Sequence, residues 1–191
     1  MEYNINTENQ LKVLVPLAQG CEELEAVTIT DLLTRAGMKV ITAGLDEQAV
    51  IASRGMVFIP STTIDAVLSD AFDLMVLPGG LPGATHLQND ARIQDKLKSM
   101  AEENKIVAAI CAAPKALAAA GLLESKNYTC YPNSMDEGLT DKTLYSEDNV
   151  VIDGNIVTSR GPGTAMEFTL SLIEMTLGKS KREEVEKPLL R

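Results

Sequence analysis

The fold of this chain is indicated most directly by one segment, residues 105–121, which reads KIVAAICAAPKALAAAG. Its first part, residues 106–110, is a continuous apolar run of the length that is typical of a buried strand. The part after Cys111 is rich in alanine, has Pro114 near its start and stops at Gly121, as helices commonly do. The segment therefore predicts a strand that turns directly into a helix, with a cysteine at the turn.

This placement of Cys111 is typical of a nucleophile elbow, in which a reactive side chain is held in a tight turn between strand and helix. Such a strained turn requires small neighbours, and here they are Ala109, Ala112 and Ala113. The glycines that are usual in the motif are absent. A helix start beside the sulfur favours a thiolate. The alternative is a buried cysteine that only fills space at the end of a strand.

Strand-like and helix-like segments alternate along the rest of the chain. Strands are expected over residues 11–17, 39–45, 73–80 and 105–110, and helices over residues 22–36, 90–104, 113–121 and 164–178. Residues 49–61 read as two short strands, and residues 149–159 as a hairpin. This alternation predicts one α/β domain, with a mostly parallel sheet and helices on both faces. Residues 1–10 are expected to form a flexible leader, and residues 179–191 a polar, helical tail.

Composition narrows the class of function. Hydrophobic residues make up 45% of the 191 residues, and no apolar run reaches the length of about 18 residues that indicates a membrane span. The net charge of −10, from 17 basic and 27 acidic residues, argues against nucleic acid as a partner. Three widely separated cysteines without a CxxC pair indicate neither a disulfide framework nor a zinc site. We therefore expect a cytoplasmic protein that needs no metal or cofactor.

A second candidate residue is Glu25, which falls on one narrow stripe of its predicted helix together with Ile29 and Ala36. This stripe places the carboxyl group on the side that faces the core. Burial raises the pKa of a carboxyl group, so Glu25 is expected to be protonated at neutral pH and to lower the thiol pKa of Cys111 by donating a hydrogen bond. The alternative is that Glu25 reaches solvent from the helix start. Its neighbour Glu22 is interpreted as an ordinary acid of the first helical turn.

A third feature is the LPGG loop that follows another predicted strand. Sites in parallel sheets form at the carboxyl ends of strands, where this loop, Glu25 and Cys111 would meet. The backbone N–H groups of Gly79, Gly80 and Ala112 are candidates for binding a developing oxyanion. The alternative is that the two glycines only permit a turn.

Taken together, these segments resemble the ThiJ/PfpI superfamily, and within it the group of the parkinsonism-associated protein deglycase and its bacterial relatives. The resemblance extends from about Lys12 to Gly178. It rests on these segments, in this order: LAQGCEELEAV, RAGMKV, VLPGG, AAICAAP and SRGPGTAMEF. It implies a flavodoxin-like three-layer sandwich that forms a homodimer, with Cys111 as the reactive cysteine and Glu25 as the buried glutamate.

The resemblance also assigns roles to residues around the cysteine. The family's oxyanion donors match Gly79, Gly80 and Ala112. A loop that packs beside the family's cysteine matches SRGPG, which nominates Arg160 and Pro162 as supporting residues. Arg35 and Arg54 match arginines near the family's dimer interface.

Two departures from the family pattern bear on activity. Many relatives carry a histidine where this chain has Tyr131, and the archaeal protease branch has one directly after its cysteine, where this chain has Ala112. Tyr131 therefore remains a supporting candidate without a known role. The single histidine, His86, is expected to be exposed in a loop. Without a Cys–His pair, peptidase or amidase activity is the least favoured interpretation.

With the resemblance, these residues imply a cofactor-free glyoxalase or deglycase with a role in oxidative or carbonyl stress. Its substrates would be α-oxoaldehydes such as methylglyoxal, or their early adducts with protein and nucleotide amines. Cys111 would add to the aldehyde, the N–H groups would hold the oxyanion, and Glu25 would move a proton between the two substrate carbons.

The alternative from another class is a redox-sensing stress protein or chaperone that acts through oxidation of Cys111. The same two residues serve both interpretations, so the sequence does not separate them. The expected partners are small reactive aldehydes or glycated amines and a second copy of the chain, with no nucleic acid and no membrane.

Overall fold

The computed structural model describes residues 10–141 and 144–190 of the chain. The predicted leader, residues 1–10, therefore lies outside the described residues except for its last position. In chain order the elements are β1 (Lys12–Leu17), α1 (Glu23–Arg35), β2 (Lys39–Gly44), β3 (Val50–Ile51), β4 (Val57–Phe58), β5 (Thr62–Thr63), α2 (Ile64–Val67), β6 (Leu74–Leu77), α3 (Gly83–Asn89), α4 (Ala91–Glu102), β7 (Ile106–Ile110), α5 (Pro114–Ala119), β8 (Val150–Asp153), β9 (Ile156–Ser159), η3 (Pro162–Thr164), α6 (Ala165–Leu177), α7 (Lys179–Glu186) and η4 (Lys187–Leu189).

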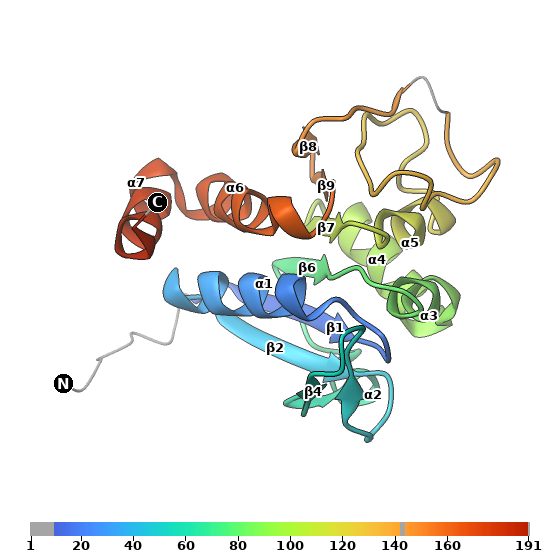
Figure 1. Ribbon diagram of the computed structural model, residues 1–191, viewed down its shortest axis with the longest axis horizontal. Helices are drawn as coiled ribbons and strands as arrows, with labels where there is room; N and C mark the ends of the chain where they lie inside the picture. The colour runs from blue at the N-terminus through green and yellow to red at the C-terminus, as the bar shows by residue number, and fades with distance from the viewer. Residues whose placement is uncertain (1–9, 142–143, 191) are drawn as a thin grey trace.

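The main sheet has seven strands in the order β5-β2-β1-β6-β7-β9-β8. Neighbouring strands pair in parallel, except β8 and β9, which form an antiparallel hairpin. The short strands β3 and β4 pair with each other in a hairpin outside this sheet. The prediction of an α/β domain with a mostly parallel sheet is confirmed (Figure 1).

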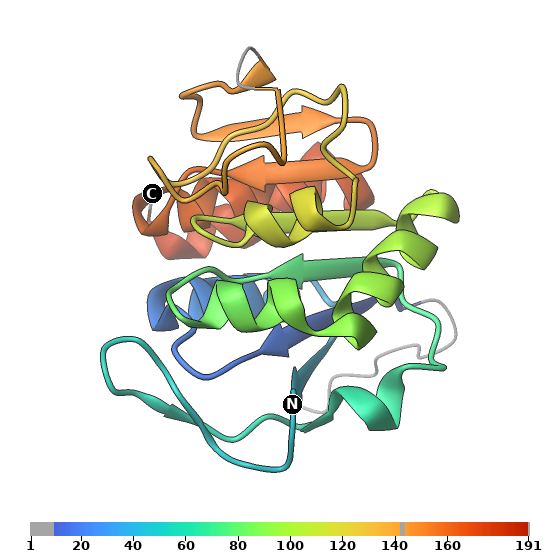
Figure 2. The same cartoon turned by 90° about the vertical axis from the view of Figure 1, so that its right-hand side faces the viewer.

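Helices cover both faces of the sheet. On one face α1 packs against α6, and on the other α3, α4 and α5 contact one another (Figure 2). The central strands lie between these layers and are apolar on both faces, as the fully buried Leu14, Met75 and Ala108 show. The predicted three-layer sandwich is therefore confirmed. No helix among the described residues is long and apolar enough to cross a membrane.

Three short elements were not predicted, namely β5, α2 and α3. The helix α3 follows the LPGG loop directly, and its sequence GATHLQN has no apolar stripe that would have indicated a helix. It is stabilised by packing on α4 and α5 instead. The predicted tail is helical from residue 179, as expected, because α7 and η4 continue the chain to residue 189.

The order of the strands brings the candidate residues together. The chain passes from β1 to β2 on one side of the sheet, and from β6 to β7 on the other, so the boundary between β1 and β6 is a topological switch point. Since β1, β6 and β7 are parallel, the loops after them leave the same edge of the sheet. These loops carry Gly20, Gly79 and Cys111 respectively.

Candidate active site

Cys111 lies in the turn between β7 and α5. Its φ of 62° is in the left-handed region that residues other than glycine rarely adopt, so the turn is strained in the way that the elbow pattern predicts. Both backbone groups are held: the Cys111 N–H donates to the Ser159 carbonyl at 2.9 Å, and the Cys111 carbonyl accepts from the Tyr131 N–H at 2.8 Å. The residue is 8% exposed, which leaves the sulfur a narrow access to solvent.

Glu25 lies in the first turn of α1 with its side chain directed into the core. It is fully buried, as is Ile29 on the same stripe, so the placement predicted from the helical spacing is confirmed. Its Oε2 accepts a hydrogen bond of 2.7 Å from the Gly79 N–H. Its Oε1 is buried with no hydrogen-bond partner among the described residues. One carboxyl oxygen is therefore held by the LPGG loop, and the other has no hydrogen-bond partner among the described residues.

Gly79 separates the carboxyl group from the cysteine and leaves no room for a side chain. A Cβ atom on Gly79 would lie 2.7 Å from the Cys111 Cβ and 2.9 Å from the Glu25 Oε2. Only a glycine permits this approach, because both distances are shorter than real carbon contacts allow. The absence of a side chain at this position thus brings the thiol and the carboxyl group together.

The electrostatics of Glu25 follow from its burial. Loss of water raises its pKa to about 7, while the hydrogen bonds with the Gly79 N–H and the Cys111 thiol oppose this shift and the nearby charge of Glu22 adds to it. The predicted direction of the shift is confirmed. A carboxyl group with a pKa near neutrality can both accept and donate a proton at physiological pH, which suits general acid–base chemistry.

The thiol of Cys111 does not behave as expected from the sequence. Burial raises its pKa to about 12 and the negative charge of Glu25 adds to this, whereas the N–H groups of Gly80 and Ala112 at the sulfur act in the opposite direction. The prediction of a lowered thiol pKa is wrong, because two N–H groups and a six-residue helix do not offset the loss of water. The thiol of Cys111 is therefore protonated at neutral pH.

The three candidate oxyanion donors are not equivalent. The Gly79 N–H is already used by Glu25. The N–H groups of Gly80 and Ala112 face the Cys111 sulfur. Two of the three groups are thus available beside the thiol, and the third supports the carboxyl group.

A cavity of about 310 Å³ opens above the thiol. Its walls come from separate chain segments and consist of Glu22, Ser53, Arg54, Gly80, Leu81, Cys111, Ala112, Tyr131, Ser134 and Pro162. Tyr131 and Pro162, which were nominated from the sequence, contribute to this wall. Glu25 does not, because it is fully buried behind Gly79. Within the described part of the chain, no group of three or more histidine, cysteine or acidic side chains is placed to hold a metal ion.

Two other nominated residues, and the single histidine, lie apart from the thiol. Arg160 lines an adjoining cavity of about 400 Å³ and reaches the Glu147 carboxylate at 3.7 Å. Arg35 is exposed and pairs with Asp31 on its own helix. His86 is exposed, as expected, but it lies in α3 and not in a loop, and it lines a separate cavity of about 170 Å³.

Four residues of the cavity were not identified as site residues from the sequence, namely Glu22, Ser53, Leu81 and Ser134. The Ser53 hydroxyl lies 2.8 Å from Glu22 Oε2 and 3.0 Å from Glu23 Oε2, so the β3–β4 hairpin is held against the start of α1. The run of acidic residues before Glu25 was the only local signal. Nothing in the sequence around Ser53 indicated that the hairpin would reach the cavity.

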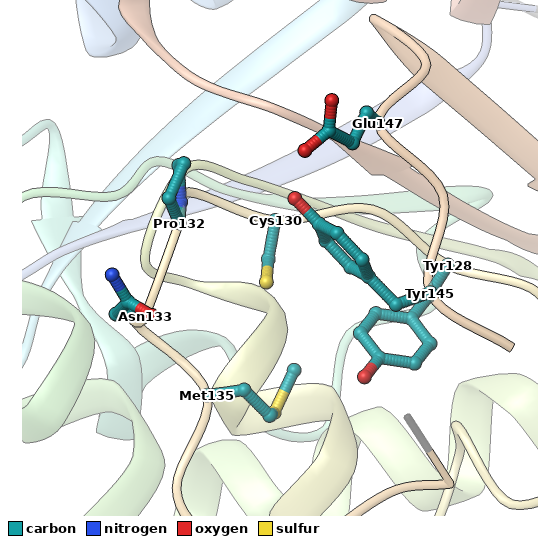
Figure 3. A pocket seen from close by; sticks show the side chains of 7 residues that line it. All are labelled: Tyr128, Cys130, Pro132, Asn133, Met135, Tyr145 and Glu147. Atoms are coloured by element: carbon teal, nitrogen blue, oxygen red, sulfur yellow. The ribbon is translucent and has the colours of Figure 1, made fainter. Parts of the chain in front are cut away.

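The other two cysteines lie in different surroundings. Both are free and buried, and burial raises the pKa of Cys21 to about 12. Cys130 lines a separate cavity of about 340 Å³, where its side chain lies among Tyr128 and Tyr145 (Figure 3). Burial raises its thiol pKa as well. Of the three cysteines, Cys111 is the one that combines a strained turn with facing N–H groups.

Comparison with known proteins shows the family of the chain. Residues 11–175 match the model of the DJ-1/PfpI family. The chain belongs to the DJ-1/PfpI family. The resemblance that the motifs around Cys111 and Glu25 indicated is thereby confirmed at the level of the family.

Individual DJ-1 proteins match over almost the whole chain. Protein dj-1beta of Drosophila melanogaster is 46% identical over 179 residues, which are 93% of this chain and 95% of the relative. Its crystal structure superposes with a TM-score of 0.89 at 43% identity and covers 95% of this chain and 98% of the other. Oxidized DJ-1 of Toxoplasma gondii gives a TM-score of 0.90 at 38% identity, covering 94% and 98%. The glutathione-independent glyoxalase DJR-1.2 of Caenorhabditis elegans is 34% identical over 177 residues, covering 93% and 94%.

Proposed function

We propose that this DJ-1/PfpI protein is a cofactor-free, cysteine-dependent glyoxalase or deglycase for α-oxoaldehydes such as methylglyoxal, or for their early adducts with amines. One observation carries the proposal: the Cys111 thiol lies beside a fully buried Glu25 with a pKa near 7, below a cavity of about 310 Å³. A relative at 34% identity that is named a glyoxalase supports the same reaction class.

In the first step the thiol adds to the aldehyde carbon. Because the thiol pKa is raised, the proton leaves for Glu25 as the S–C bond forms, and the carbonyl electrons move to oxygen. The N–H groups of Gly80 and Ala112 are the donors closest to the new oxyanion. Glu25 then returns the proton to this oxygen, which yields a hemithioacetal.

In the second step the hemithioacetal carbon loses its hydrogen as a proton, and the resulting enediol is protonated on the neighbouring carbon. The product is a lactate thioester on Cys111. Water hydrolyses this thioester to lactate and the free thiol, so the net reaction adds one water and needs no oxidant or reductant. An early adduct of methylglyoxal with an amine is a hemiaminal. When the hemiaminal releases its amine, the aldehyde forms again and the same steps follow.

The test is release of D-lactate from methylglyoxal by purified protein, with controls for loss of the aldehyde to buffer. Cys111→Ala should abolish lactate release, because no nucleophile remains in the strained turn. Cys130→Ala should retain most activity, since this thiol lines a different cavity. Lactate release by Cys111→Ala would contradict a covalent mechanism.

A second candidate function is redox sensing through Cys111. The Glu25 Oε1 is buried without a hydrogen-bond partner among the described residues, and a protonated carboxyl group could donate from it to an oxygen added to the sulfur. A structural relative is described as oxidized DJ-1. If no lactate forms but peroxide converts Cys111 selectively to a sulfinate, as read by intact-protein mass spectrometry, this second function is favoured.

We also propose that the protein acts as a homodimer. Exposed apolar side chains gather on α1 and the β3–β4 hairpin, namely Leu24, Val27, Ile51, Met56, Val57 and Ile59. The hairpin is tied to α1 because Glu23 Oε1 accepts from the Arg54 N–H at 2.8 Å. Apolar side chains grouped in this way are typical of protein–protein interfaces, and identical subunits commonly use the same surface twice.

A further inference from the structure

We propose that Glu22 is the residue that moves the proton between the two substrate carbons, whereas Glu25 serves the thiol. This inference rests on the proposed function, whose reaction needs proton transfer at two separate places: at sulfur and oxygen, and at carbon. Glu25 is fully buried behind Gly79 and does not line the cavity. Glu22 does line it, together with Cys111.

In the folded chain a single residue, Gly80, lies between the backbone of Glu22 and the Cys111 thiol. The N–H of Gly80 faces the Cys111 sulfur. On its other side Gly80 is pressed against the start of α1, where an added Cβ would lie 2.4 Å from the Glu22 nitrogen. The Glu22 N–H in turn donates to the Gly79 carbonyl at 2.9 Å. Glu22 is thus fixed to the same loop that supports the thiol and the buried carboxyl group.

The hydrogen bonds of Ser53 allow Glu22 to hold or to release a proton. The Ser53 Oγ lies 2.8 Å from Glu22 Oε2 and 3.0 Å from Glu23 Oε2, and its single hydrogen can be donated to only one of them at a time. When Glu22 is charged, Ser53 donates to it. When Glu22 is protonated, Glu22 donates to the Ser53 oxygen, and Ser53 turns its hydrogen to Glu23. Both protonation states of Glu22 therefore have a hydrogen-bond partner.

Glu22 is also the one side chain with a carboxylate among the described residues that line this cavity. The other polar side chains of the described cavity belong to Ser53, Arg54, Tyr131 and Ser134. Among the described residues that line the cavity, Glu22 alone carries a carboxylate, an acceptor that can take a proton from carbon, whereas hydroxyl, phenol and guanidinium groups enter the reaction already protonated. By chemistry and by position, Glu22 is the base available to the carbon.

The step balances without any co-reactant. The Glu22 carboxylate removes the hydrogen of the hemithioacetal carbon as a proton, the C–H electrons form the carbon–carbon double bond, and the π electrons of the neighbouring ketone move to its oxygen, which gives the enediol as its anion. Glu22 then gives the proton to the neighbouring carbon, while the enediol oxygen on the sulfur-bearing carbon becomes the thioester carbonyl. The proton of that oxygen passes to the adjacent oxygen.

The test uses Glu22→Gln and methylglyoxal that carries deuterium on its aldehyde carbon. The variant should still form the covalent adduct on Cys111, and intact-protein mass spectrometry should find the deuterium retained in it. Lactate release should fall by about 100-fold or more, the usual effect of losing a general base. Glu124→Gln, at an exposed position, is the matched control and should behave as the wild type.

Three results would overturn the inference. Wild-type lactate release by Glu22→Gln would show that another group moves the carbon proton, while the proposed function stands. Failure of the variant to form any adduct would mean that Glu22 is needed for addition of the Cys111 thiol to the aldehyde, and not for the later proton transfer. If the wild-type protein itself releases no lactate, the proposed function fails and this inference fails with it. Formation of the adduct also reports that the site of the variant is folded.

Discussion

Replacing Glu25 by glutamine should affect the unfolding free energy more favourably as the pH rises. Burial raises the pKa of this carboxyl group from its ordinary value of 4.5 to about 7 in the folded state. Between these two values the folded chain retains a proton that the unfolded chain has released. The stability that depends on Glu25 is therefore fully present below pH 4.5 and is lost as the pH rises through 7.

The magnitude follows from the interval between the two pKa values. Each pKa unit of difference between the folded and the unfolded chain is worth about 1.4 kcal/mol of unfolding free energy. The full loss of unfolding free energy is therefore about 3 kcal/mol, of which about 2.5 kcal/mol falls between pH 5 and pH 8.5. Glutamine keeps an oxygen for the Gly79 N–H and has no charge to bury. Its amide group would occupy the unpaired Oε1 position at a cost of about 1–3 kcal/mol, which does not vary with pH.

The assay is guanidinium unfolding of the wild type and Glu25→Gln at pH 5 and pH 8.5, with Glu124→Gln as an exposed control. The difference in unfolding free energy should move by about 2.5 kcal/mol in favour of Glu25→Gln at the higher pH. The control should show no such movement. A difference that is the same at both pH values would refute the buried, readily protonated Glu25 on which the mechanism depends.

Two further predictions concern packing and assembly. Gly79→Ala inserts a methyl group 2.7 Å from the Cys111 Cβ and 2.9 Å from Glu25; it should cost about 1–3 kcal/mol in thermal unfolding and abolish lactate release. Unchanged stability and activity would mean that the three residues are not in contact as described. Val57→Glu places a charge on the exposed apolar hairpin and should convert a dimer into a monomer in sedimentation at micromolar concentration. A wild-type protein that sediments as a monomer would rule out the proposed interface.

The burial of Glu25 and the turn at Cys111 could be predicted because each depends on a local pattern. The helical spacing of Glu25 and Ile29 shows which face a side chain takes, whatever it packs against. In the same way, an apolar strand followed by alanines and Pro114 specifies a tight turn, and the φ of 62° at Cys111 agrees with this.

The remaining features depend on contacts between distant segments. Ser53 reaches Glu22 only because the β3–β4 hairpin folds back over α1, and no periodicity records such a contact. The thiol pKa was predicted in the wrong direction because its value is a balance between burial and N–H groups, and the extent of burial is set by the whole fold. The helix α3 escaped prediction for a related reason, since its stability comes from its neighbours and not from its own sequence.

The hydrogen bond from the Cys111 N–H to the Ser159 carbonyl has a consequence for the order in which the protein matures. Ribosomes make Cys111 well before β9, whose pairing with β7 brings Ser159 to the turn. Until β9 is made and paired, the left-handed turn lacks this support, although Glu25 was synthesised long before. A growing or truncated chain that stops short of β9 therefore has neither the acceptor for the Cys111 N–H nor the strand that pairs with β7 beside this turn.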